Sequence, residues 1–337
     1  MQSTIVGVIG CGNISDAYFK GSARSDLIQI KACADRVPQA ATSKAETYGV
    51  AAVAVDALLA DPEIEIVLNL TVPLAHATVS REIIDAGKHV YSEKPLAARF
   101  DEGQELMRTG TERGLRIGCA PDTFLGASHQ ACRTAVDEGQ IGHVVAGTAS
   151  MLSHGMEHWH PNPAFFFQPG GGPMLDVGPY YVTELVQLLG PVERVTAQTS
   201  IATPTRTVTS EPRSGEVIDV AVPTTVNGVL SFASGANVAI TTSWDVWKHR
   251  RLPFELYGTE GRMLIPDPNF FGGEPQVSTH DEAWRPLDIS AHPFGIANRT
   301  LSSGREVADY RIIGLLDMAC ALRTGRSHRA SARSPLA

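Results

Sequence analysis

The sequence predicts a doubly wound α/β domain with a parallel sheet, followed by an α+β domain whose large, open, mostly antiparallel sheet is flanked by helices. Short apolar runs alternate with helical patterns over the first 120 residues. From about residue 143 to residue 265, alternating Thr- and Val-rich runs replace that pattern. The 337 residues suffice for two domains. We therefore predict domains 1–121 and 122–337.

Five strands are predicted in the first domain, each short, apolar or β-branched, and bounded by Gly, Pro or Asp. They are Ile5–Ile9, Ile28–Cys33, Ile64–Leu70, His89–Tyr91 and Leu115–Cys119. Helical spacing lies between them, for example after His76 and within 100–114. Strand–helix–strand units repeated in this way predict one parallel sheet with helices on both faces.

The second domain is predicted from period-two alternation, which is typical of a sheet with one buried face. The alternating runs are Val192–Ser200, Ile218–Val226, Val229–Ser234 and Ala236–Ser243. Asn227-Gly228 and Gly235-Ala236 are predicted to be hairpin turns. Helical patterns return at 179–189 and 309–323, and 266–300 is the least regular stretch.

The composition excludes several classes of protein. The formal net charge of −8 argues against a nucleic-acid or anionic-membrane partner, since both need a basic surface. No apolar run reaches the ~20 residues of a membrane span, and the N-terminus carries no export signal. The five cysteines are scattered without a C-x-x-C pair, which suits a reducing compartment and neither a zinc site nor a disulfide framework. We therefore expect a cytoplasmic protein with no metal site.

A glycine-rich turn follows the first predicted strand, in the run Gly10-Cys11-Gly12-Asn13-Ile14-Ser15. It is G-x-G-x-x-G with serine at the third glycine position. The first glycine permits the tight turn, and the second lets the backbone approach a pyrophosphate at a helix N-terminus. Because a strand precedes the turn and a helical pattern follows it, we predict a dinucleotide-binding (Rossmann) domain that uses Gly10, Gly12, Asn13 and Ile14.

The choice of dinucleotide depends on Asp35, which ends the second predicted strand. An acidic residue there accepts the ribose 2′-OH and repels a 2′-phosphate, which favours NAD over NADP. Arg36 keeps NADP open, because an arginine accepts a 2′-phosphate. Asp35 could also be an ordinary loop carboxylate.

Two further segments carry a resemblance to a known family. The first runs from Thr71-Val-Pro73 through His76 to Glu93-Lys94-Pro95, and the second is Gly170–Tyr181, which contains Asp176-Val-Gly-Pro-Tyr180. With the glycine turn, the chain from residue 4 to about 330 resembles the glucose–fructose oxidoreductase / inositol dehydrogenase / rhizopine-catabolism (Gfo/Idh/MocA) family. The resemblance implies that Thr71, Pro73, His76, Glu93 and Lys94 line the cofactor site. His76 is equally compatible with the start of a helix.

The resemblance assigns the proton chemistry to Lys94, Tyr180 and Asp176. Lys94 would stabilise a developing alkoxide or help move its proton. Many relatives have histidine where this chain has Tyr180, but some use tyrosine, and a lysine cation favours its phenolate. Tyr181 is the rival for this role. A continuous helix would place Asp176 and Tyr180 on one face, whereas Pro179 could start a new helix and leave Asp176 in the preceding turn.

A polar and aromatic cluster is the predicted sugar-binding segment. It contains His154, Glu157, His158 and Trp159, whose spacing fits neither a zincin helix nor a zinc finger. The resemblance implies that this stretch faces the active-site cleft, where His and Glu would bond hydroxyls and Trp159 would stack on a sugar ring. A structural loop or a subunit contact is the alternative. Asp122, after another strand, is a further candidate for substrate contact.

The resemblance implies an NAD(H)-dependent oxidoreductase that acts on a secondary alcohol or ketone of a sugar, inositol or sugar derivative. A redox-neutral, NAD-dependent glycoside-cleaving enzyme and a non-catalytic NAD- or sugar-sensing protein are the alternatives. An open sheet leaves one broad face bare, and relatives pair there, so we expect a homodimer or homotetramer. Relatives usually continue past residues 326–331 into a further helix, so we also expect a shortened C-terminus.

Overall fold

The structure, a computed structural model, describes residues 3–280, 282–301 and 303–331. By their contacts these residues form two compact units. The first unit contains the described residues up to Asp122 and those from Tyr310 onward, and the second unit is Thr123–Asp309. Helix α9 (Ile313–Thr324) thus belongs to the first unit, although the predicted second domain ran to residue 337. The expectation of a shortened chain end concerns residues 332–337, which lie outside the described residues.

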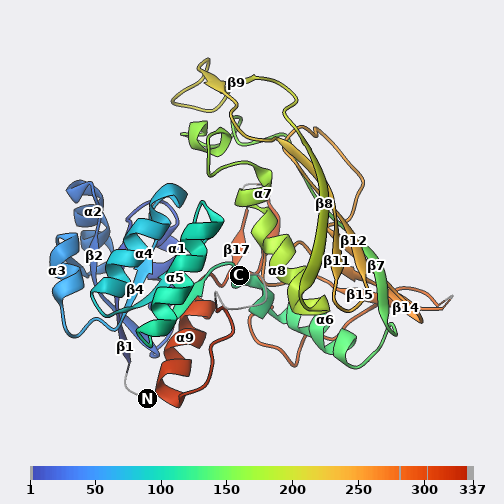
Figure 1. Cartoon of the computed structure of the whole chain (residues 1–337), viewed down its shortest axis with the longest axis horizontal. Coiled ribbons are helices and arrows are strands. Elements are labelled where there is room, and N and C mark those ends of the chain that lie inside the picture. The colour runs from blue at the N-terminus through green and yellow to red at the C-terminus, as the bar shows by residue number, and fades with distance from the viewer. Residues whose placement is uncertain (1–2, 281, 302, 332–337) are drawn as a thin grey trace. The chain divides into compact units, whose positions relative to one another are not determined.

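The first unit is built on a six-stranded sheet in the order β3-β2-β1-β4-β5-β6, with every pair parallel. Figure 1 shows this sheet among its helices. The strands are β1 (Thr4–Ile9), β2 (Ile28–Ala34), β3 (Ala51–Ala52), β4 (Ile66–Asn69), β5 (His89–Ser92) and β6 (Ile117–Cys119). The helices before α9 are α1 (Ser15–Ser22), α2 (Pro38–Tyr48), α3 (Val55–Ala60), α4 (His76–Asp85) and α5 (Phe100–Glu112). The predicted parallel α/β domain is confirmed.

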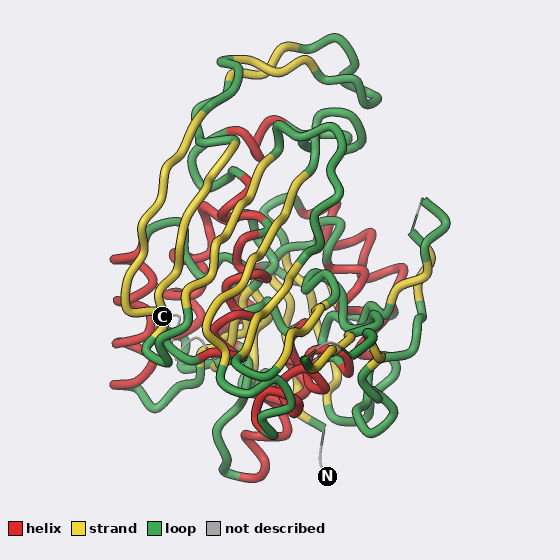
Figure 2. The backbone as a smooth tube through the Cα atoms, turned by 90° about the vertical axis from the view of Figure 1, so that its right-hand side faces the viewer, coloured by secondary structure: helices red, strands yellow, loops and turns green. Residues whose placement is uncertain are grey.

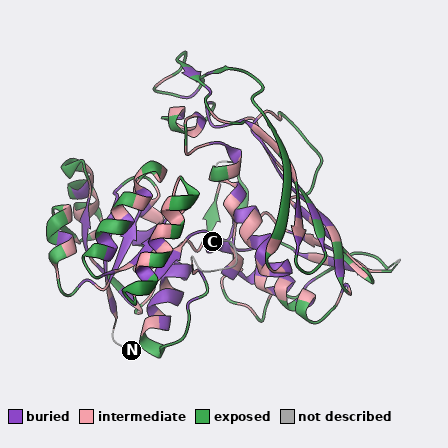
Figure 3. Cartoon of the chain, in the orientation of Figure 1, coloured by how far each residue is buried: buried purple, intermediate pink, exposed green. Residues whose placement is uncertain are grey.

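Burial of the central strands explains their near-continuous apolar sequence. All four residues of β4 are buried, and Val67, Ile83 and Leu106 share one hydrophobic core with their neighbours. Figure 3 shows these strands buried and the outer faces of the helices exposed. Because all these strands are parallel, their carboxyl ends lie at one edge of the sheet, and the strand order reverses there between β1 and β4.

The second unit is built on an eight-stranded sheet in the order β16-β15-β14-β13-β7-β12-β11-β8. Figure 2 shows its long strands running side by side. β7 and β12 are parallel and the other pairs are antiparallel, so the sheet is mixed but mostly antiparallel, as predicted. The strands are β7 (Val144–Leu152), β8 (Val192–Ser200), β11 (Thr225–Phe232), β12 (Asn237–Ser243), β13 (Phe254–Gly258), β14 (Gly261–Ile265), β15 (Gln276–Thr279) and β16 (Arg285–Pro286). Two small sheets pair β9 (Thr205–Thr207) with β10 (Val217–Asp219) and β17 (Arg299–Thr300) with β18 (Glu306–Val307).

One of the two predicted hairpin turns is wrong. Asn227-Gly228 lies inside β11, where Gly228 pairs with Ala197 on one side and Ile240 on the other. A Cβ on Gly228 would come within 3.1 Å of the carbonyl oxygen of Thr196, so this glycine permits a close strand approach. The other turn is confirmed, because Gly235 joins β11 to β12 with a φ of +92°.

Helices cover one face of the larger sheet. They are α6 (Ala127–Asp137), α7 (Pro173–Asp176) and α8 (Gly178–Leu189), which bury the inward-facing residues of β7, β11 and β12. β8 is exposed along almost its whole length, including Val195 at 60%. Among the described residues, no helix combines the length and the apolar composition needed to cross a membrane.

Candidate active site

The glycine turn after β1 has a geometry that only glycine satisfies at its first position. Gly10 has a φ of +104°, and a Cβ on it would lie 2.5 Å from the carbonyl carbon of Leu70. Gly12, in contrast, is exposed, and a Cβ there would meet nothing within 4 Å. The first glycine is therefore needed by the protein itself, whereas the second leaves room for a group outside it.

Ser15 and Asp35 fix this turn through hydrogen bonds. Ser15, at the third glycine position, is fully buried, and its hydroxyl donates to the carbonyl of Gly12 at 2.6 Å. The Asp35 carboxylate accepts the N–H of Cys11 at 2.7 Å and the N–H of Val37 at 2.8 Å. Each carboxylate oxygen has a second lone pair, so Asp35 retains capacity for a ligand hydroxyl. Arg36 is exposed beside it.

The loop after β4 is tied to the loop after β5 by a buried histidine. His76, only 1% exposed, begins α4, and its ring nitrogens lie 2.9 Å from the carbonyl oxygen of Thr71 and 2.5 Å from that of Pro95. The prediction of His76 at a helix start is confirmed. Val72 and Leu74 beside Pro73 are 64% and 66% exposed. This loop therefore presents an apolar surface that the sequence analysis did not single out.

Glu93 holds the segment that precedes Lys94. Its buried carboxylate accepts the hydroxyl of Tyr18 at 2.9 Å through one oxygen and the N–H of Lys94 at 3.0 Å through the other. Burial raises the pKa of Tyr18 well above its usual range, so the phenol remains the donor. Tyr18 comes from α1, directly after the glycine turn, so this contact links the turn to Lys94.

Asp122 is a buried carboxylate with a backbone partner. It is 2% exposed and accepts the N–H of Gly314, in the first turn of α9, at 2.8 Å. Burial raises the pKa of Asp122 to about 6, although the Gly314 N–H and the charge of Arg311 oppose the shift. A Cβ on Gly314 would lie 2.1 Å from the hydroxyl oxygen of Tyr91, which explains the glycine. The hydrogen bond of Asp122 is thus to helix α9 of the same unit.

In the second unit, Asp176 and Tyr180 lie on two separate helices. α7 ends at Asp176, and α8 begins at Gly178 with Pro179 in its first turn. The prediction of a new helix near Pro179, with Asp176 in the preceding turn, is confirmed. Tyr180 is 4% exposed and belongs to the core of this unit.

Tyr181 is buried in the same core. Its ring stacks on Phe254 with centroids 4.9 Å apart, and burial, with Asp267 as its hydrogen-bond partner, raises its pKa above the usual range. A phenol held in this way is a poor proton donor or acceptor near neutral pH. These contacts count against Tyr181 as a proton-transferring group.

The segment after β7 separates into buried and exposed residues. Glu157 is 5% exposed and pairs with Arg206, whereas His158 is exposed and Trp159 is 59% exposed. His154 stacks on Trp247 with ring centroids 3.3 Å apart, and burial lowers its pKa. Among the described residues, no group of three His, Cys, Asp or Glu side chains is arranged to hold a metal ion.

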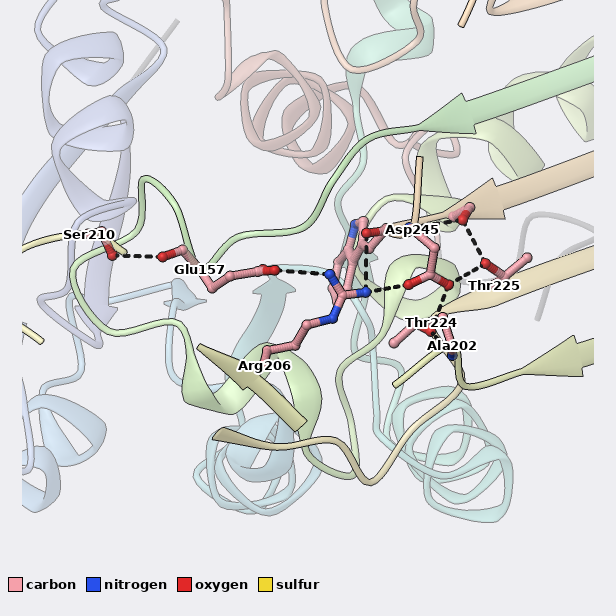
Figure 4. A network of polar contacts seen from close by, with 9 residues as sticks. Glu157, Ala202, Arg206, Ser210, Thr224, Thr225 and Asp245 are labelled. Carbon is pink, nitrogen blue, oxygen red and sulfur yellow. Dashed lines mark hydrogen bonds and ion pairs between the residues drawn. The ribbon is translucent and has the colours of Figure 1, made fainter. Parts of the chain in front are cut away.

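A buried ion-pair network supports this segment, and sequence reasoning missed it (Figure 4). Arg206 on β9 is 8% exposed and bonds the Glu157 carboxylate at 2.9 Å and the Asp245 carboxylate. Asp245 also accepts hydroxyl hydrogens from Thr224 at 2.8 Å and Thr225 at 2.6 Å. We call these five residues the Arg206 network. It joins segments separated by 49 and 39 residues in the sequence, so no local pattern could reveal it.

The glycine turn and Asp35 fit a dinucleotide, because the open space at Gly12 and the free lone pairs of Asp35 are what a pyrophosphate and a ribose need. Residues 5–120 match the family model described as "Oxidoreductase family, NAD-binding Rossmann fold". Residues 129–264 match the model described as "GFO/IDH/MocA C-terminal domain". The two matches agree with the order of the two units.

Individual relatives are similar along much of the chain. A 1,5-anhydro-D-fructose reductase of Ensifer adhaerens is 26% identical over 267 residues, covering 77% of this chain and 74% of the relative. A dTDP-3,4-didehydro-2,6-dideoxy-alpha-D-glucose 3-reductase of Streptomyces violaceoruber is 34% identical over 200 residues, covering 56% of each chain. The solved structure of a levoglucosan dehydrogenase in complex with NADH and L-sorbose has the same fold, with a TM-score of 0.83 at 23% identity, covering 98% of this chain and 92% of the other.

Proposed function

The chain belongs to the Gfo/Idh/MocA family of NAD-binding oxidoreductases, and from that premise we propose that it transfers a hydride between a nicotinamide and a secondary alcohol or ketone of a sugar, inositol or sugar derivative. The relatives named above act, by their names, on sugars and sugar derivatives, which favours a carbohydrate substrate. Bound NAD(H) supplies the hydride acceptor or donor, so the protein's part is to bind, orient and manage charge.

The single observation that carries the proposal is the arrangement around Lys94. Glu93 bridges the Tyr18 hydroxyl and the Lys94 N–H, directly after the carboxyl end of β5. In parallel sheets, ligands bind at this edge. We propose that Gly10 and Gly12 receive the pyrophosphate, that Asp35 bonds the ribose 2′-OH, and that Thr71 and Pro73 line the same site. Asp35 makes NAD the preferred dinucleotide.

The proposed proton chemistry uses Lys94 and Tyr180. The Lys94 ammonium stabilises negative charge on the substrate oxygen while its C–H bond breaks. Tyr180 takes the hydroxyl proton during oxidation and returns it during reduction, and Asp176 bonds a neighbouring hydroxyl. His154, His158 and Trp159 contact the sugar, with the exposed indole of Trp159 as a stacking surface. Glu157 and Asp122 remain candidates for substrate contact, although both have partners within the protein.

A substrate screen tests the proposal. Sugars, inositols and glycosides are incubated with NAD⁺ and NADP⁺, and the absorbance of reduced nicotinamide is followed. We expect net NADH in stoichiometry with product and little turnover with NADP⁺. Product without net NADH would indicate the redox-neutral glycoside-cleaving reaction. Nucleotide binding without any turnover would indicate a sensor.

A lysine substitution tests the catalytic assignment once a substrate is identified. Lys94→Ala is expected to lower kcat by roughly 10²–10³-fold, the usual contribution of a positioned charged or proton-transferring group. Its affinity for NADH is measured in parallel, because the resemblance also places Lys94 at the cofactor site. Lys20→Ala removes an exposed lysine from α1 and serves as the matched control. Unchanged activity of Lys94→Ala would remove Lys94 from the mechanism.

We propose that the chain forms a homodimer or homotetramer through the open sheet. Val229 on β11 and Tyr257 on β13 are 42% and 36% exposed, and the strand register places both on the sheet face opposite to the buried Leu230 and Leu256. Exposed apolar side chains gathered on one sheet face are typical of a protein–protein contact. Light scattering should give a multiple of the chain mass, and Val229→Arg should reduce it.

A further inference from the structure

A run of four basic residues stands out in this acidic protein. Lys248-His249-Arg250-Arg251 is the longest uninterrupted run of Lys, Arg and His in the sequence, whose formal net charge is −8. All four side chains are exposed, in the loop between β12 and β13. None of them forms an ion pair with another residue of the described chain. The run is therefore a concentrated positive surface that the fold itself does not neutralise.

The loop that carries this run is anchored at the carboxyl ends of two parallel strands. β7 and β12 pair in parallel, so both end at the same edge of the sheet. The N–H of Val246 donates to the carbonyl of Ser153 at 2.9 Å, and the N–H of Ser153 donates to the carbonyl of Ser243 at 2.9 Å. The basic run therefore starts directly beside the predicted sugar-binding segment.

Trp247 forms the link between the two segments. It is 79% exposed, yet its indole ring lies over the His154 ring at an interplanar angle of 20°. Burial lowers the pKa of His154, which favours the neutral ring for this stacking. The remaining surface of the indole is open to solvent, directly before the first basic residue.

The Arg206 network connects the loop of Trp247 to the loop of His154. Asp245, two residues before Trp247, is bound by Arg206, which also binds Glu157, three residues after His154 (Figure 4). Both loops are thus fastened to one buried guanidinium, which limits the freedom of Trp247 and His154 to move apart. An exposed aromatic ring on a fixed support is better suited to binding than a mobile side chain is, since less entropy is lost.

The end of the predicted sugar-binding segment lies in the electrostatic range of Asp176. Burial lowers the pKa of His160, and the negative charge of Asp176 opposes that shift. The segment therefore lies, within the second unit, between the charge of Asp176 and Trp247 with its basic neighbours. A substrate held by His158 and Trp159 has positive charge within the same loop cluster.

From these contacts we propose that residues 247–251 bind a negatively charged group on the substrate, so that the substrate is an anionic carbohydrate. The Trp247 indole packs on the sugar, and Arg250 and Arg251 bond a carboxylate or phosphate. Guanidinium groups recognise both anions through paired charge-assisted hydrogen bonds. The inference rests on the proposed function, because it names the substrate class of that same site.

Binding measurements with NADH present test the inference without requiring turnover. The probes are glucose, glucuronate and glucose 6-phosphate, which share a ring and differ in charge. We expect at least one anionic probe to bind tenfold or more tightly than glucose, and the advantage to shrink at high salt. Whichever anionic probe shows it identifies carboxylate or phosphate as the preferred group. Equal binding of all three probes would overturn the inference.

The double variant R250A/R251A locates the effect. It should lose the tenfold advantage of the anionic probe and leave glucose and NADH affinities unchanged. The control R108A/R113A removes two exposed positive charges, one from α5 and one directly after it, and should retain the advantage. A loss of the advantage in both variants would mean that only overall charge matters, which would overturn the assigned site. A change of oligomeric mass in R250A/R251A without any change in sugar affinity would do the same, and would identify a subunit contact.

Turnover separates this inference from the proposed function. If anionic probes bind as expected but no sugar of either kind is ever oxidised or reduced, the anion site stands and the proposed function fails. If neutral sugars are turned over and anionic sugars neither bind nor react, the proposed function stands and the anion site fails.

Discussion

The glycine turn of the first unit and the Arg206 network of the second unit solve the problem of fixing a loop in different ways. The turn uses backbone geometry: Gly10 fits against Leu70, and Asp35 accepts two backbone N–H groups. The network uses side-chain charge, with one buried guanidinium between two carboxylates. Backbone geometry tolerates almost no substitution at its key position. Buried charge tolerates substitution only if every partner stays paired.

Gly10→Ala is the substitution expected to destabilise the glycine turn most. Its Cβ would lie 2.5 Å from a backbone carbon that cannot rotate away, at a φ of +104°. Overpacking and backbone strain together predict a loss of about 5 kcal/mol in the free energy of unfolding. Urea denaturation measures it.

Gly12→Ala is the matched control for this glycine. Its Cβ would meet nothing within 4 Å, so stability should change by less than about 1 kcal/mol. NADH affinity, measured by fluorescence titration, should nevertheless fall at least tenfold, because the methyl group occupies the space of the pyrophosphate. Equal stability losses in the two variants would contradict the distinction between the two glycines.

Arg206→Met is the corresponding substitution in the Arg206 network. It leaves the Glu157 and Asp245 carboxylates without their shared cation, and removing one partner of a buried ion pair costs about 3–5 kcal/mol. Urea denaturation should show a loss of about 4 kcal/mol. Trp247 fluorescence should also change as the loop loosens.

Arg213→Met provides the comparison with an exposed ion pair in the same unit. Arg213 pairs with Glu216, and both side chains are partly open to solvent. A pair of this kind contributes less than about 1 kcal/mol. If Arg213→Met destabilised the protein as much as Arg206→Met, burial of the Arg206 network would not be the source of its effect.

At a third buried carboxylate, Asp122, burial outweighs the positive charge nearby. Asp122 accepts a backbone N–H from Gly314, and burial raises its pKa from 3.8 to about 6. The folded state therefore binds this proton more tightly than the unfolded state does. The resulting stability is complete below about pH 4 and is lost as the pH rises towards 6. The loss is about 3 kcal/mol at most, from ~1.4 kcal/mol per pKa unit.

Asp122→Asn isolates this pH dependence. The amide oxygen can still accept the Gly314 N–H, but it does not titrate, so the stability advantage of the wild type over the variant should fall between pH 4 and pH 7.

Asp317 gives the opposite sign, because Arg326, Arg329 and the Arg329 N–H lower its pKa despite its burial. The stability that Asp317 contributes should be present at neutral pH and lost as the pH falls below about 4. The free energy of unfolding of Asp122→Asn and of Asp317→Asn is measured against pH by urea denaturation. If both variants differed from the wild type in the same way across this pH range, these assignments would be contradicted.

The two regions also differ in how far the sequence predicts them. Gly10, Gly12 and Asp35 are predictable because each follows directly from a strand end and acts through nearby backbone. The helix break before Tyr180 was one of two alternatives, and Pro179 made it a reasonable one. Arg206, by contrast, lies in an alternating Thr-rich strand, where a charged residue is normally exposed. Its partners lie 49 and 39 residues away, so only the folded structure reveals them.

The wrong turn at Asn227-Gly228 has the same origin. The dipeptide is a strong local hairpin signal, but β8 and β12 pair with β11 on both sides of it. Pairing along the whole of β11 outweighs a two-residue preference. A neighbouring strand, like the partners of Arg206, is tertiary information that a local pattern does not contain.

The smallest predicted effect is that of Tyr18→Phe, which tests whether the glycine turn and Lys94 are coupled through Glu93. Tyr18→Phe removes one hydroxyl hydrogen bond to Glu93, and the expected loss of stability is about 1 kcal/mol. Because Glu93 also holds the Lys94 N–H, we expect kcat to fall several-fold while the dissociation constant of NADH stays the same. Tyr48→Phe removes an equivalent bond to Asp16 between α2 and α1 and should cost similar stability with no change in kcat. If both variants lowered kcat equally, the effect would follow from general loosening of the first unit. If neither did, Glu93 would be a structural residue, and backbone geometry alone would set the position of Lys94.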